Sequence, residues 1–165
     1  MKPALYLEST IPSYLTAHPS RDLIVAAHQQ ITHEWWQHAR TRFSLFVSEA
    51  VLEAIAGGDP SAAARRRALV AGIPVLELTQ EVTERAAEYR TGLSLPPRAQ
   101  LDAVYIAFAV TYDVDYLLTW NCTHLANGVL IRRLYELNLS LGRKTPVIAT
   151  PEELLKRPEG EQDVE

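Results

Sequence analysis

Three side chains with carboxylate or amide oxygens stand at the ends of apolar segments in this 165-residue chain. Glu8 follows the apolar run 4–7, Asp102 opens an apolar helix, and Asn121 follows the short apolar run 116–119. If these runs are parallel strands, they share one carboxyl edge, and side chains placed just beyond them can converge there. Hard oxygen ligands suit Mg²⁺ or Mn²⁺, ions that keep several waters and take only a few carboxylates from the protein. The pattern therefore predicts a divalent cation site.

Two more acids lie on the helix that follows the second predicted strand. Glu49 and Glu53 are one helical turn apart, so they occupy nearly the same face of that helix. Either could supply a further carboxylate to the site. The alternative is that both are solvated charges on an amphipathic helix, and the sequence leaves open which of the two is the second acid.

Hydroxyl groups and one histidine accompany the predicted ligands. Ser9, Thr10 and Thr119 could orient a carboxylate or a bound water, or they could satisfy backbone groups at strand ends. His124 could contact a phosphate, transfer a proton or bind a softer metal. Asn121 has a structural alternative too, as a turn residue. A cation held here could polarise a phosphoryl oxygen and lower the pKa of a bound water, which is the chemistry of phosphodiester hydrolysis.

Composition sets the frame for this site. With 47% apolar residues, the chain can fill one core, and its single cysteine excludes an internal disulfide. No stretch resembles a secretory signal or a membrane span, so we expect a cytoplasmic protein. A glycine-rich phosphate loop is absent, which argues against a nucleotide cofactor. We expect a single domain over residues 1–150, followed at 151–165 by a short turn and an acidic, disordered tail.

Hydrophobic periodicity and cap signals predict alternating strands and helices with no hairpin. This order favours an α/β fold with a central parallel sheet of about five strands between helices. The polar residues after the first strand, up to Pro12, are interpreted as a turn. Predicted strands cover 4–7, 43–47, 74–78, 116–119 and 146–148, and the main predicted helices cover 22–39, 49–56, 60–72, 80–89 and 102–112. A further helix is predicted after Gly128, with Leu130, Ile131, Leu134 and Leu137 facing inward.

Four motifs in order along the chain carry a resemblance to a known family. They read YLESTIPSYL, FVSEAVLEAIAGGDP, LDAVYIAFA and DYLLTWNCTHLAN. Together they resemble the PIN domain, and specifically the VapC-type toxins of bacterial toxin–antitoxin modules, over residues 4 to 150. The resemblance implies a metal-dependent ribonuclease whose site is a ring of acidic residues that holds Mg²⁺ or Mn²⁺.

When the family's acidic ring is carried over residue by residue, two of its four positions hold residues that are not acidic in this chain. Its first acid, usually aspartate, falls on Glu8, and its third on Asp102. The second acid of the family pattern falls on Ala54, so Glu53 is the nearest substitute. The fourth falls on Asn121, which can offer a carbonyl oxygen but no negative charge. The implied catalytic set is therefore Glu8, Glu53, Asp102 and Asn121.

The resemblance also implies partners. These are an RNA substrate, an antitoxin protein whose segment enters the acidic groove, and a second copy of the chain. A homodimer is favoured as well by Trp35 and Trp36, which offer more large apolar surface than one small core needs. The alternative function is a PIN-fold module with a weakened metal ring, which binds RNA or a partner protein without cutting.

Overall fold

The computed structural model describes residues 1–160 and places five strands in one parallel sheet. The strands are β1 (Ala4–Leu7), β2 (Ser44–Ser48), β3 (Val75–Leu76), β4 (Tyr116–Leu118) and β5 (Val147–Ala149), in the order β3-β2-β1-β4-β5. Leu7 pairs with Leu118, and the Glu8 amide donates to the Leu118 carbonyl over 3.1 Å. The register thus brings the first residues beyond β1 and β4 to the same point of the sheet edge.

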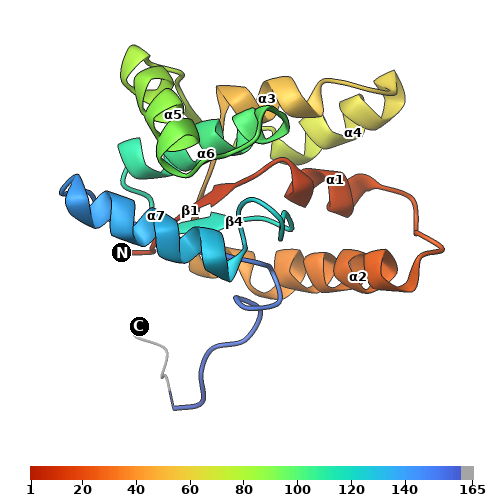
Figure 1. Ribbon diagram of the computed structural model, residues 1–165. Helices are drawn as coiled ribbons and strands as arrows, with labels where there is room; N and C mark the ends of the chain where they lie inside the picture. Colours follow the sequence, from red (N-terminus) through yellow and green to blue (C-terminus); the bar gives the residue numbers. More distant parts are fainter. Residues whose placement is uncertain (161–165) are drawn as a thin grey trace.

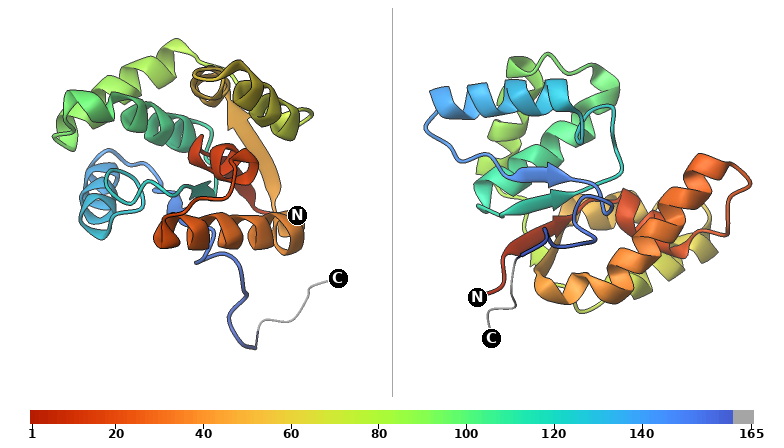
Figure 2. Two further views of the ribbon diagram at one scale, coloured as in Figure 1. Left: turned by 90° about the vertical axis from the view of Figure 1, so that its right-hand side faces the viewer. Right: turned by 90° about the horizontal axis from the view of Figure 1, so that it is seen from below.

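Helices cover both faces of this sheet. They are α1 (Thr10–Thr16), α2 (Leu23–His38), α3 (Glu49–Ile55), α4 (Pro60–Val70), α5 (Gln80–Gly92), α6 (Gln100–Thr111) and α7 (Gly128–Ser140), with short 3₁₀ helices at Arg40–Arg42 and Pro97–Ala99. In Figure 1, α3, α4, α5 and α6 lie above the strands, and α2 and α7 lie below. Seen from below in Figure 2, α7 and α2 lie on either side of β1, β4 and β5. The predicted α/β class and parallel sheet are confirmed.

The helix that carries Asp102 lies deep in the molecule. From Ala103 to Val110, every side chain of α6 except that of Val104 is buried, as expected from a helix with almost no polar face. It packs most extensively against α5. A carboxylate in the first turn of such a helix has little access to bulk water, so its partners must come from the protein or from a ligand.

Cap signals place the helix starts close to where they were predicted. The Ser48 hydroxyl accepts a hydrogen bond from the Val51 amide at the start of α3, and the Thr79 hydroxyl accepts one from the Val82 amide at the start of α5. Asp59 caps α4. The cap residue Ser48 is the last residue of β2, so α3 begins directly at the carboxyl edge of the sheet.

One prediction about local structure is wrong. The residues that follow Glu8 form helix α1 instead of a turn, and Pro12 is tolerated because it lies in the first turn, where its missing N–H has no intrahelical partner. Asp102 lies in the first turn of α6, which begins at Gln100, and Ala99 occupies the cap position without a side-chain bond. The Asp102 carboxylate is therefore free for other contacts.

The segment after β5 has no further helix or strand among the described residues. Pro151 to Leu155 forms turns, and Lys156 lies in a bend. The acidic end of the predicted tail, residues 161–165, lies outside the described residues. Within residues 1–160, no helix combines the length and the apolar character needed to cross a bilayer.

Candidate active site

Glu8 lies at the centre of a dense set of hydrogen bonds at the sheet edge. Only 3% of its surface is exposed. Its Oε1 accepts a hydrogen bond from the Ser9 hydroxyl over 2.8 Å. Its Oε2 accepts three, from the Thr10 amide at 3.0 Å, the Thr10 hydroxyl at 2.5 Å and the Thr119 hydroxyl at 2.9 Å. The three predicted hydroxyl residues thus all contact this carboxylate.

The backbone after β4 fixes these hydroxyls in turn. The Trp120 amide donates to the Thr10 hydroxyl oxygen and the Asn121 amide to that of Thr119, both over 2.9 Å. With these oxygens accepting from the backbone, their hydrogens point toward Glu8. A carboxylate has about four acceptor positions, so Oε2 is saturated, whereas Oε1 retains room for one more partner. Glu8 can therefore bind a ligand through Oε1.

Asp102 lies beside Glu8 and is also buried, with 8% of its surface exposed. Its Oδ1 accepts a hydrogen bond from the Asn121 side-chain amide over 3.0 Å, and its Oδ2 lies 3.4 Å from Nδ1 of His124. Burial and the nearby charge of Glu8 raise the pKa of Asp102 to about 6, although His124 and Asn121 act in the opposite direction. The rise in the pKa of Asp102 thus comes first from burial and second from the charge of Glu8, which His124 and Asn121 offset only in part.

Asn121 contacts this pair through its nitrogen. Its Oδ1 accepts hydrogen bonds from the amides of Thr123 and His124, at 3.1 and 3.0 Å, and so closes the turn after β4. Its Nδ2 donates to Asp102. Both ends of the amide are therefore engaged, and the carbonyl oxygen that the sequence offered as a metal ligand faces the turn. Asn121 therefore has the structural role of a turn residue and also contacts Asp102.

Glu49 and Glu53 lie elsewhere, in a pocket of about 380 Å³ between α3, α5 and α6. Glu49 accepts a hydrogen bond from the Leu78 amide, and Glu53 is exposed. Across residues 1–160, no group of three or more His, Cys, Asp or Glu side chains is arranged to hold a metal ion. Glu53 is one position, or about 100° of helix rotation, from the ring position at Ala54.

Tyr105, which stands one turn after Asp102 on α6, was not among the residues predicted for the site. It is buried, and its hydroxyl donates to the Ser9 hydroxyl oxygen over 3.1 Å, which in turn donates to Glu8. Its ring packs edge-on against Tyr6, with 6.3 Å between centroids. A tyrosine three positions after the acid on a buried helix was the available signal, because residues at that spacing share a face.

Trp120 closes the site on the side of α2. Its Nε1 donates to the Thr32 hydroxyl over 2.7 Å, and its ring stacks on His28 with 4.0 Å between centroids. Only 7% of its surface is exposed. Trp120 therefore holds the loop after β4 against α2, and its ring is not free to stack on a base.

Together these residues form a compact set of oxygen donors with excess negative charge. Two buried carboxylates, one with a free acceptor position, fit a hard divalent cation, which commonly takes only one or two carboxylates from a protein and completes its shell with water and substrate oxygens. The site contains no thiolate and one histidine, so it does not fit a structural zinc ion.

Several solved structures share the fold of this chain. One is VapC20 of Mycobacterium tuberculosis, described as a toxin that cleaves the sarcin-ricin loop, with 13% identity, a TM-score of 0.58, and coverage of 73% of this chain and 92% of that one. Another is VapBC2 of Rickettsia felis bound to a promoter DNA fragment, with 11% identity, a TM-score of 0.57, and coverage of 89% of this chain and 98% of that one. The chain has a VapC-like PIN fold. No family model matches the sequence, and no curated protein matches it significantly.

The PIN fold confirms the fold predicted from the four motifs. It also places Glu8 and Asp102, which the resemblance matched to the first and third acids, at one edge of the sheet. Identities of 11% and 13% support the architecture only, so the activity has to be argued from this chain's own residues.

Proposed function

We propose that this protein is a divalent-metal-dependent ribonuclease of the PIN toxin type. The observation that carries the proposal is the pair of buried carboxylates, Glu8 and Asp102, with a raised pKa on Asp102 and no strong cation beside it. A bound Mg²⁺ or Mn²⁺ would relieve this repulsion. The fold supports the same activity by analogy, since VapC20 is described as an RNA-loop-cleaving toxin.

The cation would be held by Glu8 through Oε1 and by Asp102. When bound, it would polarise a phosphoryl oxygen and lower the pKa of a coordinated water. The protein's own contribution is orientation. Thr10 and Thr119 fix the Glu8 carboxylate through its other oxygen, and Asn121 positions Asp102. Partners of this kind, which hold the ligands from behind, commonly affect metal affinity as strongly as the ligands' own chemistry.

His124 is placed to act on the substrate. Its Nδ1 faces Asp102, and 18% of its side chain is exposed. An imidazole held on one nitrogen by a carboxylate presents the other nitrogen in a defined direction. We assign His124 to the contact with the scissile phosphate, a role in which its loss should slow the reaction less than the loss of Asp102.

Partners are part of the proposal. The VapBC2 structure is a complex bound to promoter DNA, which supports an antitoxin partner for this chain as well. We propose that the protein acts on RNA in the cytoplasm and forms a homodimer. Trp35 is buried in the core, so of the two tryptophans only Trp36, half-buried beneath the Arg40 guanidinium, can contribute to such an interface.

A second candidate function is a PIN module that binds RNA or a partner protein without cutting. It is favoured by one observation, that residues 1–160 contain no group of three acids, histidines or cysteines arranged for a metal. Ala54 and Asn121 stand at two positions where the family's ring is acidic. Cleavage assays separate the two candidates.

The test is RNA cleavage in Mn²⁺ by protein purified free of any antitoxin. Asp102→Asn should lower the rate by about 10²-fold or more, because it removes a charge that holds the metal near the developing phosphoryl charge. The matched control is Asp113→Asn, at the other end of the same helix, where the residue is exposed and has a φ of 50° that asparagine tolerates. The proposal fails if the wild type shows no metal-dependent cleavage, or if Asp102→Asn cleaves as fast as Asp113→Asn.

A further inference from the structure

A pocket of about 380 Å³ opens beside the candidate active site, between α3, α5 and α6. Its walls are mostly apolar, with Ala86 and Ala87 from α5 facing Leu101 and Val104 from α6. Leu101 is the neighbour of Asp102 in the first turn of α6. The pocket and the carboxylate pair therefore lie on adjacent faces of one helical turn.

Charged groups of opposite sign lie at different ends of this pocket. Along α5 the lining runs from Thr83 to Arg90, which are seven residues or about 10 Å apart on a helix. Glu49 is bonded to the amide of Leu78, which comes just before α5, so this acid lies at the Thr83 end. Arg90 lies at the other end. Glu53 follows Glu49 by one turn of α3.

Arg90 is the unusual member of this lining. Its side chain is half-buried, yet within residues 1–160 its guanidinium forms no hydrogen bond or ion pair. A partly buried guanidinium has lost some of its hydration and normally gains charge-assisted hydrogen bonds in return. A phosphate would supply such bonds to Arg90, because a planar guanidinium matches a phosphate in geometry.

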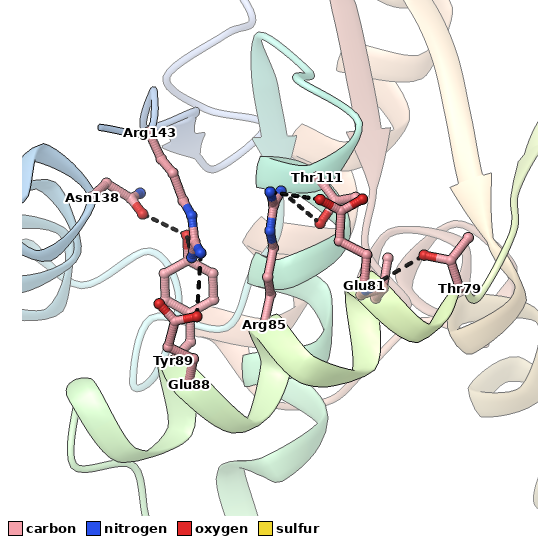
Figure 3. Close-up of polar contacts among 9 residues, drawn as sticks. Thr79, Glu81, Arg85, Glu88, Tyr89, Thr111, Asn138 and Arg143 are labelled. Atoms are coloured by element: carbon pink, nitrogen blue, oxygen red, sulfur yellow. Dashed lines mark hydrogen bonds and ion pairs between the residues drawn. The ribbon is translucent and has the colours of Figure 1, made fainter. Parts of the chain in front are cut away.

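The wall that carries Arg90 is held rigidly from behind. Figure 3 shows the opposite face of α5, where Arg85 contacts Thr111 of α6 and Tyr89 donates to Asn138 of α7. Arg143 bridges to Glu88 over 3.2 Å. These contacts leave the pocket-lining face of α5 free while fixing its position, which is how a preformed ligand site is built.

We propose that this pocket receives one unstacked nucleotide of the RNA substrate, with a phosphate on Arg90 and the base between the apolar side chains of α5 and α6. The proposal rests on the ribonuclease function and adds to it a substrate subsite. A base that is turned out of the stack can be held between apolar side chains, and 380 Å³ is ample for one base and part of its sugar.

The polar rim of the pocket favours particular bases. Glu49 and Glu53 are acceptors only, and Gln100 at the mouth can accept or donate. Carboxylates accept from exocyclic amino groups, as in the pairing of Glu or Asp with the cytosine amino group. The subsite therefore prefers adenine, cytosine or guanine to uracil, which has no amino group.

The experiment measures binding of short single-stranded RNA oligonucleotides in EDTA, so that no cleavage occurs. Arg90→Gln should weaken binding about tenfold, in line with the loss of one phosphate contact. The matched control is Arg98→Gln, an exposed arginine outside the pocket, which should change affinity less than about twofold. Ala87→Phe fills the pocket from an exposed helix position and should abolish the preference for amino-bearing bases over uracil.

Wild-type affinity and base preference in both Arg90→Gln and Ala87→Phe would overturn the subsite. So would a change of molecular mass in Ala87→Phe with unchanged RNA binding, because the pocket would then be a protein contact. Failure of the nuclease function gives a different result. If the wild type binds the oligonucleotides in an Arg90-dependent way in EDTA but shows no cleavage in Mn²⁺, the subsite stands and the enzymatic function fails.

Discussion

Two buried polar clusters in this protein use similar groups and differ in charge balance. In the cluster around Tyr89 (Figure 3), the hydroxyl donates to Asn138, and Arg143 lies 3.2 Å from Glu88 and 3.4 Å from the tyrosine oxygen. Each polar group has a partner, and the one acid has a cation. The cluster joins α5 to α7 and to the segment before β5, and it needs no ligand.

In the cluster around Glu8 and Asp102, the polar groups have hydrogen-bond partners, but the negative charge of the two carboxylates is not neutralised. Two carboxylates lie together, and His124 is their only nearby basic group of those described. Burial, and after it the charge of Glu8, raises the pKa of Asp102, which is a cost to the folded state that a bound cation would reduce. The two clusters thus differ in charge balance, and the unbalanced one is the candidate for binding a cation.

The largest effect on stability should come from breaking the balanced cluster. Asn138→Ala leaves the buried Tyr89 hydroxyl without its acceptor and opens a small cavity, so the free energy of unfolding should fall by about 3 kcal/mol. Urea denaturation measures this. RNA cleavage by the remaining folded protein should be unchanged, and a selective loss of cleavage would contradict the separation of the two clusters.

A smaller effect of opposite sign should come from the unbalanced cluster. The folded-state pKa of Asp102, about 6, exceeds its ordinary value of 3.8, so the folded state binds the extra proton between these values and loses stability as pH rises through them. Asp102→Asn removes this penalty and should raise the free energy of unfolding by about 2 kcal/mol at pH 7.5 in EDTA. The gain should vanish near pH 4. If Asp102→Asn raised the free energy of unfolding equally at both pH values, the gain would not come from the ionisation of Asp102.

The smallest effect concerns the residue behind Glu8. Tyr105→Phe removes the hydroxyl that donates to Ser9 but keeps the ring that packs on Tyr6, so stability should fall by less than about 1 kcal/mol. Cleavage should slow about threefold, because Glu8 keeps its other hydrogen bonds. Steady-state kinetics in Mn²⁺ measures the change. A loss above about a hundredfold would mean that Tyr105 contacts the substrate itself.

Much of this site follows from the order of strands and polar residues. Parallel strands share one carboxyl edge, so the meeting of Glu8, Thr119 and the residues after β4 was predictable. The approach of Asp102 was predictable as well, because its helix leads into β4. Each of these contacts could be predicted because it follows from where the residue lies in its strand or helix.

The orientation of side chains was not predictable in the same way. Whether Asn121 turns its oxygen or its nitrogen toward Asp102 depends on two backbone amides of its own loop. Glu53 lines the pocket between α3, α5 and α6, and its direction depends on its position on α3, because one position turns a side chain by about 100°. Arg90 carried no signal at all, since an unpaired arginine is recognised only when its surroundings are known. Such details depend on neighbours that are distant in sequence.

The most direct test of the central claim is the position of a bound cation. Crystals soaked in Mn²⁺ and measured by anomalous scattering should show a peak in contact with Glu8 Oε1 and with Asp102, and the peak should be absent in crystals of Asp102→Asn. A peak that lies instead on Glu49 and Glu53, or no peak beside Glu8 at saturating Mn²⁺, would contradict the account.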